Sequence, residues 1–234
     1  MELSSLGKKS RRSYNERSLL PVMSASQLLG SIKHQHYLDA VKDIVKLDDD
    51  YYAALYTPLL ETFVEFAQLI PFKFKDDLQS LANRSLLRAK IALEHVEDDK
   101  DDLFKYALFS AGLLLDIGHV MLNRGYFMAD KDGVYQQDWQ PFEGNMMELG
   151  DYYRIKRRGG VQPIVHQINP LLARQVMPEV GFNWLVSNIE IFTMWMAILT
   201  GDSRRMGELG FILDRSKEAF EEALEAGELD AIAV

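Results

Sequence analysis

One stretch, Ala107–Val120 (ALFSAGLLLDIGHV), constrains the fold more than any other part of the chain. Apolar residues recur at helical spacing through Phe104, Ala111 and Leu114, and the residues between them are also mostly apolar. A helix that is apolar nearly all round must be covered by other helices, so this stretch predicts the central helix of a bundle. Near its end stands a single acid, Asp116.

A carboxylate on such a helix is costly to bury unless it is paired, hydrogen-bonded or bound to a metal ion. Two interpretations of Asp116 therefore stay open. In the first, the carboxylate joins a hydrogen-bond network at the end of a core helix. In the second, it belongs to a site with a chemical function, for which other parts of the chain supply the remaining groups.

The length and composition indicate one soluble domain. A chain of 234 residues can bury one sizeable core, and its 47% hydrophobic and 26% charged residues are typical of globular proteins. The longest apolar run, Trp184–Leu199, contains Asn188 and Glu190 and falls short of the roughly 18 residues of a membrane span. We therefore expect no membrane insertion. The absence of cysteine excludes disulfides and thiolate metal sites and favours a cytoplasmic location.

The net charge of −9 is unevenly distributed. Residues 1–20 carry five basic and two acidic side chains, a net charge of +3, which leaves −12 for the rest. An acidic body argues against broad nucleic-acid binding. Residues 1–17 are predicted to be a disordered basic arm, or an arm that orders on a partner or on DNA, and its candidate contact residues are Lys8, Lys9, Arg11 and Arg12.

The rest of the chain has the periodicity of an all-α protein, with one domain over residues 18–226 and a tail over 227–234. Apolar spacing predicts helices over Tyr37–Val45, Tyr52–Ile70, Leu78–His95, Pro163–Met177, Phe182–Thr200 and Met206–Ala226. A long irregular insertion, Asn123–Gly150, contains glycine and proline breakers among aromatic residues. Either a small hairpin or a loop held by its aromatic side chains fits this insertion.

A second basic cluster follows at Asp151–Gly160 (DYYRIKRRGG) and is formed by Arg154, Lys156, Arg157 and Arg158. It fits a charged helix end closed by glycine, or a docking surface for phosphate or an acidic partner. Motifs for dinucleotide, nucleotide or serine-hydrolase sites are absent, and the five histidines do not form an HExxH pair. The residues by themselves therefore assign no catalysis.

The stretch LLLDIGH, residues 113–119, resembles the LLHDIGK stretch of HD-domain metal-dependent phosphohydrolases, with Leu115 in place of the doublet histidine. The chain more specifically resembles the N-terminal HD domain of conjugative relaxases of the MobH/TraI class, found in integrative conjugative elements. The resemblance extends from about Met23 to Ala226. Its further segments, in order, are VKLDDDYYAALYTPLLETFVEFAQLIP (45–71), WQPFEG (139–144), YRIKRRGGVQPIVHQINPLLARQVMP (153–178) and TGDSRRMGELGFILDRS (200–216).

The resemblance implies an HD-like bundle with a divalent metal site built from two histidines and two aspartates. In this chain Arg84 stands where the first histidine is expected and Leu115 replaces the second, whereas Asp116 and Asp214 keep the carboxylate positions. Leucine cannot bind a metal ion and arginine repels one. We therefore expect a vestigial site with no metal, no cofactor and no catalytic residue, in which Arg84 pairs with Asp116 or Asp214.

The sequence thus predicts a non-catalytic HD-like domain that binds a protein partner, and the resemblance implies a scaffold role in conjugative transfer or type IV secretion. Two alternatives stay open. One is an active metal-dependent phosphohydrolase or relaxase domain acting on DNA, in which Asp116, Asp214 and either His119 or His166 rebuild a divalent-metal site. The other is a DNA-binding accessory protein whose basic arm contacts phosphates.

Overall fold

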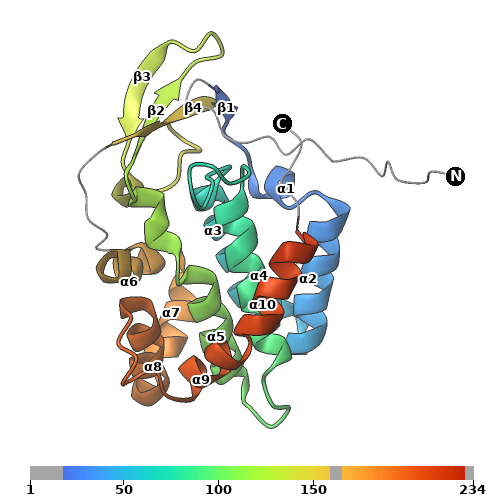
Figure 1. The fold of residues 1–234 in the computed structure, drawn as a ribbon. Coiled ribbons are helices and arrows are strands. Elements are labelled where there is room, and N and C mark those ends of the chain that lie inside the picture. Colours follow the sequence, from blue (N-terminus) through green and yellow to red (C-terminus); the bar gives the residue numbers. More distant parts are fainter. Residues whose placement is uncertain (1–17, 159–164, 230–234) are drawn as a thin grey trace, which may run out of the picture.

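A helical body carries a small β-sheet at one end (Figure 1). The computed structural model describes residues 18–158 and 165–229. The predicted basic arm, with Lys8, Lys9, Arg11 and Arg12, and residues 230–234 of the predicted tail lie outside the described residues. Two short 3-10 segments, η1 (Ile117–Met121) and η2 (Pro141–Glu143), lie between the longer elements.

Helices make up most of the described chain, as the apolar spacing predicts. They are α1 (Ala25–Leu28), α2 (Ile32–Val45), α3 (Asp49–Ala67), α4 (Ser80–Glu94), α5 (Asp102–Leu114), α6 (Val165–Val176), α7 (Glu179–Val186), α8 (Ile189–Thr200), α9 (Gly207–Arg215) and α10 (Lys217–Ala226).

Two predicted long helices are each divided in the structure. The predicted helix over 182–200 contains the end of α7 and all of α8, whose axes differ by 113°. The Asn188 side chain causes this break because it accepts from the N–H groups of Glu190 and Ile191 and caps a new helix. The predicted helix over 206–226 is divided at Ser216 into α9 and α10.

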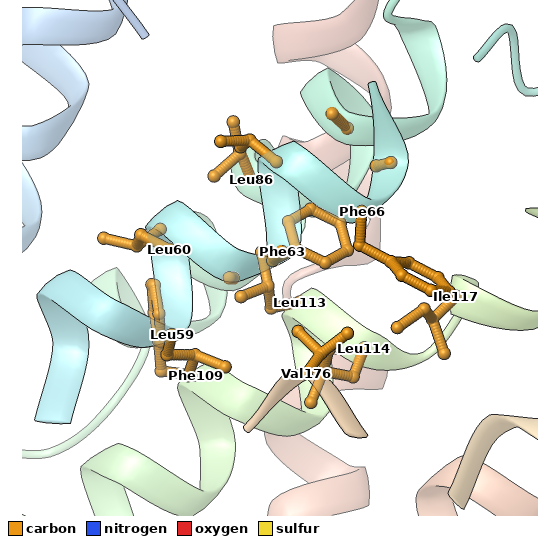
Figure 2. Packing of buried hydrophobic residues seen from close by; sticks show 14 of the residues in the cluster. Leu59, Leu60, Phe63, Phe66, Leu86, Phe109, Leu113, Leu114, Ile117 and Val176 are labelled. Carbon is orange, nitrogen blue, oxygen red and sulfur yellow. The ribbon is translucent and has the colours of Figure 1, made fainter. Parts of the chain in front are cut away.

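The apolar stretch Ala107–Val120 contains most of α5 and most of η1, and every residue from Phe104 to Leu114 is buried. Figure 2 shows how side chains of α3, α4, α6 and η1 surround it. The labelled residues are Leu59, Leu60, Phe63, Phe66, Leu86, Phe109, Leu113, Leu114, Ile117 and Val176. The segment Asp102–Met121 is long and apolar enough to cross a membrane, but 72% of it is buried inside the protein, as expected of a core helix.

A four-stranded antiparallel sheet corrects the all-α prediction. Its strands are β1 (Leu20–Pro21), β2 (Arg124–Ala129), β3 (Tyr135–Trp139) and β4 (Tyr152–Arg157), in the order β1-β4-β2-β3. The β2–β3 pair confirms the hairpin interpretation of the insertion over 123–150.

The basic cluster lies on β4, so its interpretation as a helix end is wrong. Buried Tyr153 and Ile155 alternate with the more exposed Arg154 and Lys156, which is the period of a half-buried strand. The charges and the following glycine pair predict a helix end, whereas the two-residue alternation of buried and exposed side chains is that of the strand.

Aromatic side chains fix the sheet against the helices. Trp139 is 1% exposed, and its ring contacts Phe66 of α3 and Tyr126 of β2 with centroids 5.6 and 4.9 Å apart. Its Nε1 donates to the Gly144 carbonyl at 2.9 Å. The hydroxyl of buried Tyr153 accepts from the backbone N–H of Leu69. The sheet is therefore joined to the C-terminal end of α3.

Replacing Trp139 with alanine should lower the free energy of unfolding by about 3–5 kcal/mol, because it empties a fully buried indole site. Phe142→Ala is the matched control, since that ring is 51% exposed, and should change stability by about 0.5 kcal/mol or less. Urea denaturation followed by circular dichroism measures both. Equal losses would show that Trp139 does not fix the sheet.

Candidate functional site

Asp116 lies where α5 ends and η1 begins, and an arginine from α4 is paired with it. Arg88 donates from Nη2 to Asp116 Oδ2, and the two side chains are only 11% and 15% exposed. Arg88 Nη1 also donates to the Gly112 carbonyl at 3.3 Å. The carboxylate that is costly to bury thus has a cationic partner in the core.

Small residues bring α4 and α5 close enough to form this pair. A Cβ atom added at Gly112 would lie 3.1 Å from the Ala89 Cα, so the backbones of the two helices meet at this level. Arg88 directly precedes Ala89, and its side chain therefore begins at the contact between the helices. From there it reaches Asp116 at the end of α5.

The surroundings of Asp116 stabilise its charged form. Burial alone would raise the pKa of Asp116, but the positive charges of Arg88 and Arg84, and that of His119 when it is protonated at low pH, outweigh burial and hold the pKa below its ordinary value of 3.8. Asp116 is therefore a carboxylate at neutral pH. A group with so low a pKa is poorly suited to donate a proton as a general acid.

His119 on η1 packs beside the same carboxylate. Its Nε2 lies 3.8 Å from Asp116 Oδ1, and its ring stacks on Phe72 with centroids 4.3 Å apart and planes 17° apart. Burial lowers the pKa of His119 below 6.5; Asp116 opposes this shift, and the charges of Arg124 and Arg88 add to it. The imidazole is therefore neutral at pH 7.

The arginine paired with Asp116 is not the predicted one. The resemblance predicts that Arg84 pairs with Asp116 or Asp214, whereas Arg88, one helical turn further along α4, forms the pair with Asp116. The ion pair of Arg84 is with Glu221 of α10, at 3.9 Å. Residues four apart share a helix face, so both arginines point to the same side of α4, and their sequence spacing does not distinguish them.

Aromatic rings cover both guanidinium groups. Arg84 and Arg88 lie over the Phe220 ring of α10, with the central guanidinium carbons 5.2 and 5.1 Å from its centroid. Arg84 also lies 4.6 Å from the centroid of Phe72, the ring on which His119 stacks. These cation–π contacts stabilise the two guanidinium charges inside the protein, in addition to the one acidic partner that each arginine has.

The remaining positions of the predicted vestigial site do not all meet. Leu115 packs against the core, and Arg84, Leu115 and Asp116 lie in one region of the fold. Asp214 is exposed on α9 and does not form a buried pair with Asp116. The segment 200–216, which carries part of the resemblance, thus places its acid, Asp214, on the surface of α9.

The metal-site alternative has part of its predicted ligand set in place. Asp116 and His119 are neighbours. The Asp116 carboxylate, however, is paired with Arg88, and His166 is exposed at the start of α6. Within residues 18–158 and 165–229, no three His, Cys, Asp or Glu side chains are grouped as metal ligands. The site as described is an arginine–carboxylate pair with a neutral imidazole beside it.

Sequence reasoning missed Asn169, which fixes the turn after Asp116. Asn169 is fully buried on α6; its Oδ1 accepts from Gly118 N at 2.8 Å, and its Nδ2 donates to the carbonyls of Leu115 and Leu199 at 2.6 and 3.1 Å. It thus satisfies backbone groups left open where α5 stops. The signal in the sequence is a lone polar residue on the apolar face of α6, beside Ile168.

The second basic cluster contacts its own fold. Its contacts join Arg154 to the Gly133 carbonyl (2.8 Å), Lys156 to the Phe127 ring (4.4 Å), Arg157 to the Phe74 ring (4.7 Å) and Arg158 to the Asp138 carboxylate (2.8 Å). These contacts connect β4 to the β2–β3 hairpin and to the loop before α4. The expected docking role of the cluster stays a prediction.

Compared with models of known protein families and with curated proteins, the chain gives no match. The resemblance to relaxase HD domains therefore stays an interpretation of the sequence. The structure adds the helical body, the sheet and the Arg88–Asp116 pair, and each of these is independent of that resemblance.

Replacing Asp116 with asparagine leaves the buried Arg88 charge without an anionic partner and should lower the free energy of unfolding by about 2–3 kcal/mol at pH 7. The folded-state pKa of Asp116 lies below 3.8. The stability that the Arg88–Asp116 pair contributes is therefore present at pH values above 3.8 and is lost as the pH falls through the folded-state pKa. Urea denaturation at several pH values measures the difference between wild type and variant.

The matched control is Asp214→Asn. Because Asp214 is exposed, this substitution should change the free energy of unfolding by about 0.5 kcal/mol or less. For Asp116→Asn, the difference from wild type should be constant at neutral and mildly acidic pH and should shrink only below pH 3.8. A difference that persists unchanged at the lowest pH, or none at pH 7, would contradict the assigned ion pair.

Proposed function

We propose that this chain is a non-catalytic HD-like helical domain that acts by binding a protein partner. The observation that carries this proposal is the guanidinium of Arg88 on the carboxylate of Asp116. In an HD-type site that carboxylate would hold the divalent ion. Here it is held by a permanent cation of the protein itself.

The charges around Asp116 oppose a divalent ion. Arg88 is in contact with the carboxylate, and Arg84 lies near enough to help lower its pKa. Like charges repel strongly where water is largely excluded, so binding a cation would require displacing Arg88 from a partly buried position. The second carboxylate of the expected ligand set, Asp214, is on the surface of α9.

A protein partner agrees better with the described surface than DNA does. The body of the chain is acidic, and the four basic side chains at Arg154–Arg158 already contact a carbonyl, two rings and a carboxylate of the same fold. The resemblance to relaxase HD domains supports a cytoplasmic role as an adaptor in conjugative transfer or type IV secretion. DNA contact through residues 1–17 is the alternative that the test must distinguish.

The test replaces the ion pair with apolar side chains of similar size, in the double variant Arg88→Met and Asp116→Leu. Such a replacement of a buried pair is often neutral for stability, because both charges are removed together. In a transfer system that requires this chain, the double variant should support wild-type transfer frequency, since an adaptor does not need the carboxylate. Thermal unfolding confirms that the variant is folded.

Loss of transfer by a folded double variant would contradict the proposal. So would phosphodiesterase activity of the wild-type protein with Mn²⁺, Fe²⁺ or Zn²⁺ that the double variant lacks. Steeply salt-dependent DNA binding by the full chain, abolished by deleting residues 1–17, would instead favour the accessory DNA-binding alternative.

A further inference from the structure

The two faces of the sheet differ in their chemistry. The sheet lies at one end of the helical body (Figure 1), and Tyr153 and Ile155 of β4 are buried on the face toward that body. Arg154, Lys156 and Arg158 alternate with them and lie on the opposite face, which we call the outer face. Lys156 and Arg158 are exposed, so the described part of the chain leaves this region of the outer face open to solvent.

An aromatic ring lies at the centre of the outer face. Phe127 of β2 stands opposite Arg154 in the register of the sheet and therefore shares its face. The centroid of the Phe127 ring is 4.4 Å from Lys156 Nζ and 5.7 Å from the central guanidinium carbon of Arg158. The ring of Tyr135, a residue that is 58% exposed, lies 6.1 Å from the Phe127 ring. The outer face thus has an aromatic centre with cationic side chains around it.

Two glycines give the arginines room to lie flat on the outer face. A Cβ atom added at Gly125 would overlap Arg158 Nε, and one added at Gly133 would overlap Arg154 Nη2. Arg154 also donates to the Gly133 carbonyl at 2.8 Å. Both guanidinium groups are therefore held against the β2–β3 hairpin, and less side-chain entropy is lost when a partner binds them.

The outer face is cationic, although the chain as a whole has a net charge of −9. Arg158 pairs with the Asp138 carboxylate at 2.8 Å. Arg154 contacts a neutral carbonyl and Lys156 a neutral ring, and within residues 18–158 and 165–229 neither of them forms an ion pair. These three cations and one carboxylate give a net charge of +2. Two of the cations are therefore left to attract an anionic partner.

We propose that the outer face binds an acidic, extended segment of the protein partner. This inference rests on the proposed adaptor function and names the surface that performs it. Alternate residues of an extended chain point to the same side and are about 6.8 Å apart. Arg154, Lys156 and Arg158 have this same repeat along β4. A segment lying along β4 with an acid at every second residue can therefore bring one carboxylate to each cation.

The observations favour a peptide over single-stranded nucleic acid. Nucleic acid binds such surfaces by stacking its bases on aromatic rings, but Lys156 and Arg158 already contact the Phe127 ring. A long phosphate chain would also extend from the outer face over the acidic body, which repels it. A short acidic segment is attracted at the outer face and repelled by the body, so the charge distribution directs it to the sheet.

The test is the binding of labelled synthetic peptides to the full chain at low salt, measured by fluorescence anisotropy. We expect a peptide of about 12 residues with alternating Glu and Ser to bind, and the matched peptide with Gln in place of Glu not to bind. Lys156→Glu should weaken binding about 10-fold or more. The matched control is Lys217→Glu, which makes the same charge change at an exposed position of α10 and should leave binding unchanged.

Circular dichroism checks that the variants are folded. If Lys156→Glu does not fold, Lys156→Gln, which removes the charge without adding an acid, should weaken binding about 3-fold. Absence of binding by the wild type, or equal binding by Lys156→Glu and Lys217→Glu, would overturn the proposal. So would tighter binding of an oligothymidine of about 12 nucleotides that Lys156→Glu abolishes, because the face would then belong to nucleic acid.

The proposed function and this surface fail in different ways. If the peptide does not bind but the Arg88→Met and Asp116→Leu double variant still supports transfer, the adaptor function stands and the outer face is not its docking surface. If the double variant loses transfer while peptide binding is intact, the adaptor function is contradicted and the binding surface stands. Self-association of the chain that Lys156→Glu abolishes would overturn the proposal by assigning the outer face to a second copy.

Discussion

The pairing of Arg88 with Asp116 is the interaction on which the centre of this fold depends. It places a permanent cation on a carboxylate at the end of the most buried helix, α5. Without Arg88 the charge of Asp116 would face a largely apolar environment. Contact between α4 and α5 at Gly112 makes the pair possible, and Asn169 stabilises the turn that presents Asp116.

The same region joins the helices to the sheet. Phe72, in the loop before α4, contacts Arg84 and stacks on His119, and its carbonyl accepts from Arg124 Nη2 at 2.7 Å. Arg124 begins β2, so the loop, η1 and the hairpin are connected near Asp116. Substitutions at Asp116 are therefore expected to affect the packing of the sheet as well as the local charge balance.

Helical periodicity was sufficient to predict most helices, the buried α5 and an acid at its end. It could not predict β1, a two-residue strand that pairs with β4 more than 130 residues away. Nor could it distinguish Arg84 from Arg88, because both lie on one helix face. Only the resemblance assigns Asp214 to the site, whereas the division at Ser216 and the exposure of α9 are results of tertiary packing.

The most direct test of the account is a double-mutant cycle between Arg88 and Asp116, with Arg88→Met, Asp116→Leu and the double variant compared by urea denaturation at pH 7. If the pair is the partly buried interaction described, each single variant leaves an uncompensated charge, and the coupling free energy should be about 2 kcal/mol. A coupling free energy below about 0.5 kcal/mol would contradict the claim that Arg88 stabilises Asp116.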